Sequence, residues 1–72
     1  MEIKCLKAGV CVLDMPGYGY RLLWRGNDLS HAHVTKKSGH WWVDTTNEAK
    51  ANGVFYKMVD EAKFLMNNER GE

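Results

Sequence analysis

The strongest constraint on the fold is an apolar periodicity in the last third of the chain. Apolar residues recur there at intervals of three and four positions: Ala51, Val54, Phe55, Met58, Val59, Ala62, Leu65 and Met66. On an α-helix these residues form one stripe, which needs a core to cover it. Thr45 and Glu48 have the spacing of a capping box at the start of this stripe. The sequence therefore predicts an amphipathic helix over residues 45–67, followed by a tail over residues 68–72.

The first 44 residues instead favour short strands separated by turns. Alternation with a period of two places one set of side chains on a common sheet face: Tyr20, Leu22, Trp24, Ala32, Val34, Trp41 and Val43. The opposite face is then expected to carry a more polar set: Arg21, Arg25, His31, His33, Thr35, Lys37, His40 and Trp42. Short turn sequences at Pro16–Gly17, Gly26–Asp28 and Ser38–Gly39 favour antiparallel neighbours.

Strands followed by a helix are typical of the α+β class. The sequence predicts a small antiparallel sheet of three to four strands packed against one long C-terminal helix. The N-terminal segment fits a strand pair or one bent strand with Gly9 at a turn or bulge, and it could add a fourth strand or only a lid. Because 72 residues have room for one core, residues 1–72 are expected to form a single domain.

Composition and charge exclude several classes of protein. Hydrophobic residues make up 44% and charged residues 26% of the chain, which is typical of folded domains and not of disordered chains. No apolar run has the length of a membrane span, and Lys4 and Lys7 interrupt the apolar stretch that a secretory signal would need. We expect a cytoplasmic protein without a membrane partner. Cys5 and Cys11 are then expected to be reduced thiols, and a disulfide in a secreted form is the alternative.

No residue pattern predicts catalysis or a bound metal. No metal-binding motif accompanies the three histidines that could meet on one sheet face, His31, His33 and His40. Neither the cysteines nor Ser30 and Ser38 belong to a nucleophile signature, and Gly17–Gly19 lacks the rest of a phosphate-binding loop. We therefore expect a protein that is not an enzyme and that has no cofactor.

The basic sheet face offers one candidate function, the binding of nucleic acid. Residues 1–43 carry six lysines and arginines against three carboxylates, whereas residues 44–72 carry four against six. Guanidinium groups can contact phosphates or guanine edges and an indole can stack on a base, which makes four residues candidates: Arg21, Arg25, Lys37 and Trp42. A three-stranded sheet backed by one C-terminal helix is similar in outline to the small DNA-binding domains of tyrosine recombinases and plant AP2 factors. That outline implies a nucleic-acid-binding module, which we keep as the alternative function.

The outer face of the predicted helix offers the other candidate, docking on another protein. Tyr56 and Phe64 lie about two turns apart opposite the apolar stripe, with Asp60 between them. Gly53 would leave this surface shallow and allow close approach. Aromatic residues dominate the anchors of protein interfaces, so the favoured hypothesis is a non-catalytic binding or regulatory protein, such as an inhibitor. Small phage and mobile-element proteins that modulate a host enzyme are of this kind, and a homo-oligomer formed through the same face is a variant.

Overall fold

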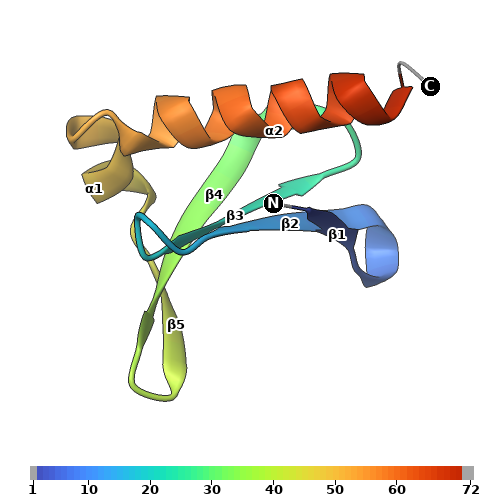
Figure 1. The fold of residues 1–72 in the computed structure, drawn as a ribbon. Helices are drawn as coiled ribbons and strands as arrows, with labels where there is room; N and C mark the ends of the chain where they lie inside the picture. The colour runs from blue at the N-terminus through green and yellow to red at the C-terminus, as the bar shows by residue number, and fades with distance from the viewer. Residues whose placement is uncertain (1, 71–72) are drawn as a thin grey trace.

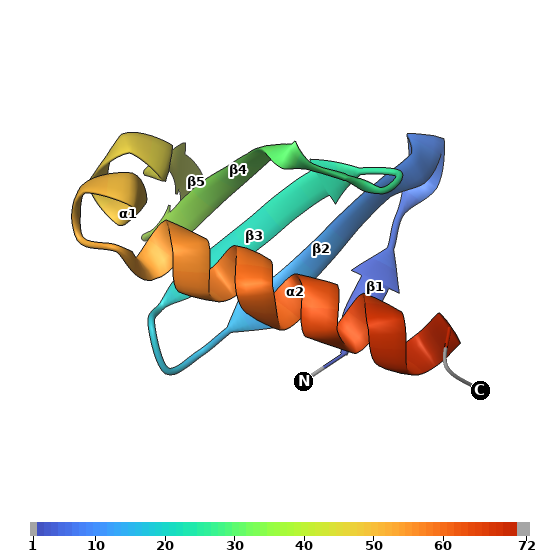
Figure 2. The same cartoon turned by 90° about the horizontal axis from the view of Figure 1, so that it is seen from above.

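An antiparallel sheet with helices on one of its faces forms the fold. The computed structural model describes the backbone of residues 2–70 and the side chains of residues 2–68. The elements are β1 (Ile3–Cys5), a short 3-10 helix η1 (Lys7–Gly9), β2 (Val10–Met15), β3 (Tyr20–Arg25), β4 (Asp28–Ser38), β5 (Trp41–Asp44), α1 (Thr46–Ala51) and α2 (Val54–Arg70). The five strands are neighbours in the order of the chain, and α2 lies across one face of the sheet (Figure 1, Figure 2). The α+β class is therefore confirmed, with five strands instead of three to four.

The additional strand comes from the N-terminal segment, which folds back on itself. Between β1 and β2 the chain reverses with Ala8 and Gly9 in the left-handed region, at φ values of 62° and 75°. The Leu6 N–H donates to the Val10 carbonyl at 2.6 Å and closes the turn. Glycine adopts this backbone conformation at no steric cost. Gly9 thus lies at the turn of a strand pair, one of the arrangements that the sequence left open for this segment.

The core lies between the sheet and the helices. Its buried members are Cys11, Leu13, Met15, Leu22, Trp24, Leu29, Ala32, Val34, Ala49, Phe55, Met58 and Ala62. Leu22 pairs with Leu13 on one side and Val34 on the other, so a row of apolar side chains crosses the sheet. Burying side chains of this size stabilises the fold by about 1.5–3 kcal/mol each relative to exposure. The predicted core face is confirmed for β3 and for the middle of β4.

A long C-terminal helix is present as predicted, but a turn at Asn52 and Gly53 divides the predicted span into α1 and α2. Gly53 has a φ of +80°, and the Asn52 side-chain oxygen accepts a hydrogen bond of 3.0 Å from the Val54 N–H at the start of α2. The stripe does not continue through this turn. Ala51, predicted to face the core, is exposed, whereas Ala49, predicted on the outer face, is fully buried.

The predicted capping box does not form either. The Thr45 side chain makes no cap hydrogen bond, and the Asp44 carboxylate instead accepts from the Thr46 N–H at 2.9 Å. Pairing between β4 and β5 ends at Thr35, so from Val34 back toward the start of the strand β4 has no strand neighbour on the β5 side. The Thr45 N–H donates to the Val34 carbonyl at 2.8 Å, and the Val34 N–H donates to the Thr46 hydroxyl at 3.0 Å. The two threonines therefore provide hydrogen-bond partners for the Val34 N–H and carbonyl at the edge of β4, because buried backbone groups need partners.

The end of the second helix also differs from the prediction. α2 continues to Arg70, so residues 68–70, predicted as a tail, are helical. Residues 71–72 lie outside the described part of the chain. Between residues 2 and 70, no helix combines the length and the hydropathy needed to cross a membrane.

The β4–β5 hairpin extends beyond the rest of the sheet (Figure 1). Tyr20, the first residue of β3, pairs with Lys36, so the part of β4 after Lys36 has only β5 beside it. Trp41 and Val43, which strand alternation predicts to be buried, are 76% and 48% exposed, so this prediction is wrong. Val43 pairs with Lys36, which pairs with Tyr20, so the three side chains point to the same face of the sheet, the one that the alternation predicts for Val43. The physical reason for its exposure is that the helices cover only the wider part of the sheet.

Candidate docking surfaces

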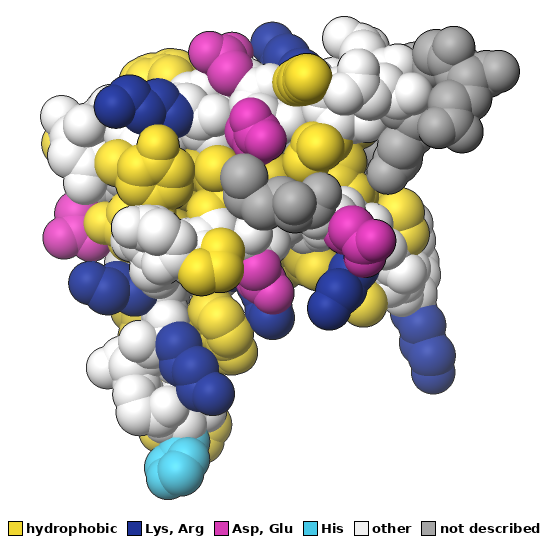
Figure 3. All heavy atoms as spheres, viewed as in Figure 1, with side chains coloured by type: hydrophobic (Ala, Val, Ile, Leu, Met, Phe, Trp, Pro, Cys, Tyr) yellow, Lys and Arg dark blue, Asp and Glu magenta, His cyan; other side chains and the backbone are white. Residues whose placement is uncertain are grey.

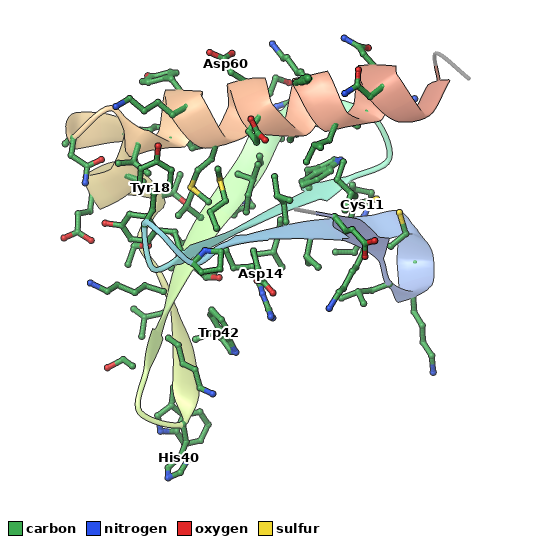
Figure 4. All side chains as sticks on the ribbon, in the orientation of Figure 1. Cys11, Asp14, Tyr18, His40, Trp42 and Asp60 are labelled. Atoms are coloured by element: carbon green, nitrogen blue, oxygen red, sulfur yellow. The ribbon has the colours of Figure 1, made fainter. Side chains whose placement is uncertain are left out.

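Three consecutive large hydrophobic residues of the edge strand β5 are exposed: Trp41, Trp42 and Val43. Lys37 and Lys36 lie opposite Trp42 and Val43 on β4. In Figure 3 hydrophobic and basic side chains lie side by side on the hairpin, and Figure 4 shows His40 at its tip. Single exposed hydrophobic residues are normal, but grouped ones mark contact surfaces; here Trp41 and Val43 share one face of the hairpin and Trp42 lies on the other. We call these five residues, Lys36, Lys37, Trp41, Trp42 and Val43, the hairpin surface.

A cation–π contact from Arg21 holds the Trp42 ring. The Arg21 Cζ atom lies 4.2 Å from the centroid of the indole, a contact that stabilises by about 0.5–1 kcal/mol at an exposed position. Asp14 in turn holds the guanidinium, with distances of 2.5 Å from Nε to Oδ1 and 3.2 Å from Nη2 to Oδ2. These hydrogen bonds lower the pKa of Asp14 and raise the pKa of Arg21. Side chains from β2 and β3 thus orient an indole that β5 supplies (Figure 4).

The four residues predicted to contact nucleic acid do not form one basic cluster. Arg25 ends β3 beside the η1 turn, whereas Lys37 lies in the hairpin at the other end of the sheet. Arg21 and Trp42 contact each other. Arg21 also lies in a row of paired residues that begins with Asp14 and ends with Asp44. Positive and negative charges are therefore interspersed on this face.

The outer face of α2 exposes the aromatic residues that the sequence analysis predicted there. Tyr56 is 58% and Phe64 is 51% exposed. Asp60 lies between them in the helix and points away from the sheet (Figure 4). The two rings are therefore separated by a carboxylate and do not form a continuous hydrophobic surface. Gly53 belongs to the turn between α1 and α2, so it does not flatten the helix as predicted.

A serine, a histidine and an aspartate meet at the start of β4. The Nδ1 atom of His31 lies 2.7 Å from the Asp28 carboxylate and 3.3 Å from the Ser30 hydroxyl, which also donates to Asp28 at 2.5 Å. These hydrogen bonds, first the one from Ser30, lower the pKa of Asp28. In a catalytic triad the serine and the aspartate contact different ring nitrogens. Here both contact Nδ1, so the imidazole does not lie between the serine and the aspartate as a base, and the cluster closes a turn.

Of the other two predicted histidines, His33 lines the same groove as His31, whereas His40 lies apart from both. The Nδ1 atom of His33 is 3.6 Å from the Asp44 carboxylate, beside an open polar groove of about 590 Å³ between β4 and α1. His40 is at the tip of the hairpin (Figure 4). His31 and His33 therefore line one groove, and His40 does not join them. Within the described residues, no group of three or more His, Cys, Asp or Glu side chains could hold a metal ion.

Comparison of the chain with protein-family models, with curated proteins and with solved structures gives no significant match. The outline similarity to tyrosine recombinase and AP2 domains therefore rests on the order of strands and helix alone. The function has to be inferred from the surfaces themselves.

Proposed function

We propose that this chain is a non-catalytic binding protein that docks on another protein through the hairpin surface. The observation that supports this most is the exposure of three consecutive hydrophobic residues, two of them tryptophans, on the edge strand β5. Exposed apolar surface is unfavourable in water by about 25 cal/mol per Å². Tryptophan is also among the residues most enriched in the energetic centres of protein interfaces. A partner that covers Trp41 and Val43 would therefore gain free energy from their burial.

The orientation of Trp42 supports the same proposal. Association costs conformational entropy for each side chain that becomes ordered at an interface. Because Arg21 already holds the indole from one side, and Asp14 holds Arg21, part of this ordering precedes binding. The hairpin surface therefore presents an oriented indole, Trp42, on one face of the hairpin and the more exposed Trp41 on the other.

The charges of the hairpin indicate the chemistry of the partner. Between Lys36 and Val43 the chain carries two lysines and one histidine and no carboxylate. Interfaces combine an apolar centre with a polar rim, and complementary charges on the two rims speed association and exclude wrong partners. We infer that the partner presents an apolar surface bordered by aspartate and glutamate side chains.

Nucleic acid fits this surface less well than an acidic protein does. Arg21 covers one face of the Trp42 indole, so only the other face could stack on a base. The Arg21 charge is also balanced by Asp14, and Asp44 in the same row would repel phosphate groups. Binding of nucleic acid to the basic sheet face therefore stays the alternative, to be decided by experiment.

A regulatory role follows naturally from docking without catalysis. A small protein of a phage or mobile element that alters a host enzyme would act in this way, and an inhibitor is the simplest form. The outer face of α2, with Tyr56, Asp60 and Phe64, is the rival location for the contact. Self-association through that face is a further possibility that the same experiment separates.

The experiment compares three forms of the tagged protein in capture from a native lysate, with and without nuclease. They are the wild type, the hairpin variant Trp41→Ala with Val43→Ala, and the matched helix-face variant Tyr56→Ala with Phe64→Ala. All four substituted side chains are exposed, so each variant should keep a thermal melt close to that of the wild type. We expect one nuclease-resistant protein to be captured by the wild type and the helix-face variant and lost by the hairpin variant.

Other outcomes contradict the proposal in distinguishable ways. Loss of the partner in the helix-face variant alone would move the contact to α2. Loss of the captured material on nuclease treatment, with affinity that falls steeply as salt rises, would favour nucleic acid. Capture of the untagged chain itself through Tyr56 and Phe64 would indicate self-association. Capture that is unchanged in both variants would exclude both surfaces.

A further inference from the structure

Cys5 and Cys11 face each other across the two N-terminal strands. They are directly opposite in the β1–β2 pairing, and their Sγ atoms are 2.9 Å apart. The hydrogen bond from the Leu6 N–H to the Val10 carbonyl makes the neighbouring positions a hydrogen-bonded pair. Cys5 and Cys11 are therefore a non-hydrogen-bonded pair, in which the Cα atoms of antiparallel strands are about 4.5 Å apart. This separation lies within the range of disulfides, so the two sulfurs can bond without movement of the strands.

The two thiols differ in accessibility. Cys5 is exposed on β1, whereas Cys11 belongs to the buried core. An oxidant in solution can therefore reach Cys5 directly. Cys11 is shielded from the same oxidant but lies in contact with the Cys5 sulfur. This arrangement is the one that a first attacking thiol and a second, resolving thiol require.

We propose that Cys5 and Cys11 form a redox modification site, which a small-molecule disulfide such as glutathione disulfide converts to a cross-strand disulfide. The Cys5 thiolate attacks one sulfur of the small disulfide, forms a mixed disulfide and releases one thiolate. Cys11 then gives up its proton and attacks the Cys5 sulfur, which forms the intramolecular bond and releases the second thiolate. The protein loses two electrons and two protons, and the oxidant takes them up as two thiols.

The product would fasten an edge strand to the sheet. β1 has only three residues and pairs with β2 alone, so its contribution to the fold depends on that pairing. A disulfide restricts the unfolded chain and so stabilises the folded state. The hairpin surface belongs to β4 and β5, on the other edge of the sheet. The inference is therefore independent of the proposed docking function.

The test treats the reduced, full-length protein with glutathione disulfide and follows the intact mass and the thermal melt. We expect the wild type to lose the mass of two hydrogen atoms, to remain a monomer on a non-reducing gel, and to melt about 5 °C higher or more. Dithiothreitol should reverse both changes. The matched variant Cys5→Ser changes an exposed side chain, so it should stay folded and show neither the mass loss nor the shift in the melt.

Four results would overturn the proposal. They are stable glutathione adducts on the wild type without an internal bond, disulfide-linked dimers, no reaction of the folded protein, and an internal bond that leaves the melt unchanged. The first three would show that the two thiols do not act as a pair. The last would show that the bond forms without fastening β1 to the fold.

Discussion

Asp14 and Arg21 face each other across β2 and β3, and their contact links stability to pH. The hydrogen bond from Arg21 keeps the pKa of Asp14 below its ordinary value. Because the pKa is lower in the folded chain than in the unfolded chain, the pair stabilises the protein above the ordinary aspartate pKa of about 3.9. This contribution is lost as the pH falls through the folded-state value. The Asp14 side chain is 45% exposed, so solvent screening limits the contribution to about 0.5 kcal/mol.

We predict that Asp14→Asn lowers the free energy of unfolding by about 0.5 kcal/mol at neutral pH, and that this effect is lost at acid pH as the pH falls through the lowered folded-state pKa of Asp14. Below that pKa the wild-type carboxylate is protonated, so the two proteins carry the same charge at this position. Denaturant titrations at both pH values measure the difference. An equal loss at both would mean that the side chain contributes through packing and not through its charge.

Gly53 provides a second prediction for a single residue. Its φ of +80° is unfavourable for any residue with a Cβ atom, and no atom lies within 4 Å of the position that a Cβ would occupy. Gly53→Ala should therefore destabilise the protein by about 1 kcal/mol through the backbone alone. Thermal or denaturant melts measure this change. In a continuous helix the same substitution would instead stabilise by about 1 kcal/mol.

The matched control for that prediction is Gly17→Ala. Gly17 also has open space around its Cβ position, but its φ is not in the left-handed region. This variant should be as stable as the wild type or slightly more stable, because alanine restricts the unfolded chain. A higher melting temperature for Gly53→Ala would contradict the turn at Asn52 and Gly53 and would indicate one helix over residues 46–70.

At the scale of elements, the orientation of α1 is tested by two alanines in the same helix. Ala49 is fully buried and α1 packs against β4, whereas Ala51 is exposed. Ala49→Gln should lower the free energy of unfolding by about 2 kcal/mol or more, because it overpacks the core and buries an amide. Ala51→Gln should change it by less than about 0.5 kcal/mol. A larger loss for Ala51→Gln than for Ala49→Gln in denaturant melts would instead support the single apolar helix face that the sequence predicts.

The helix break shows what the apolar pattern can and cannot predict. Val54 follows Ala51 at a spacing of three, which fits an uninterrupted helix, so the periodicity gives no sign of a turn. The one local signal is Gly53, since glycine is unfavourable inside a helix. The stripe from Phe55 to Ala62 was predictable because it reflects a repeating contact with one sheet face. The absence of the capping box was not predictable from local sequence, because Thr45 and Thr46 bond to Val34, a residue distant in sequence.

At the scale of the whole molecule, the exposed tryptophans follow from unequal strand lengths. β4 has eleven residues and its neighbour β3 has six, so part of β4 must lie beyond β3. The pairing of Tyr20 with Lys36 determines that the excess includes the hairpin end. Alternation correctly predicts the face of Val43 but carries no information on whether a core reaches that row. Strand alternation therefore predicts Trp41 in the core, and only the register shows that it is exposed.

The candidate docking site could be predicted only in part for the same reason. Tyr56 and Phe64 are exposed as predicted, because the outside of an amphipathic helix depends on local periodicity. Trp42 was predicted on the open sheet face, but its contact with Arg21 depends on which strands are neighbours. Contacts between strands that are distant in sequence therefore determine both the anchor and its orientation.

The most direct test of the docking account is the affinity of the purified partner for three forms of the chain, measured by isothermal titration calorimetry. They are the wild type, Trp41→Ala with Val43→Ala, and Tyr56→Ala with Phe64→Ala. The account predicts that the hairpin variant binds at least about 30-fold more weakly, which corresponds to about 2 kcal/mol. The helix-face variant should stay within about 3-fold of the wild type. Wild-type affinity in a folded hairpin variant would contradict docking through β5.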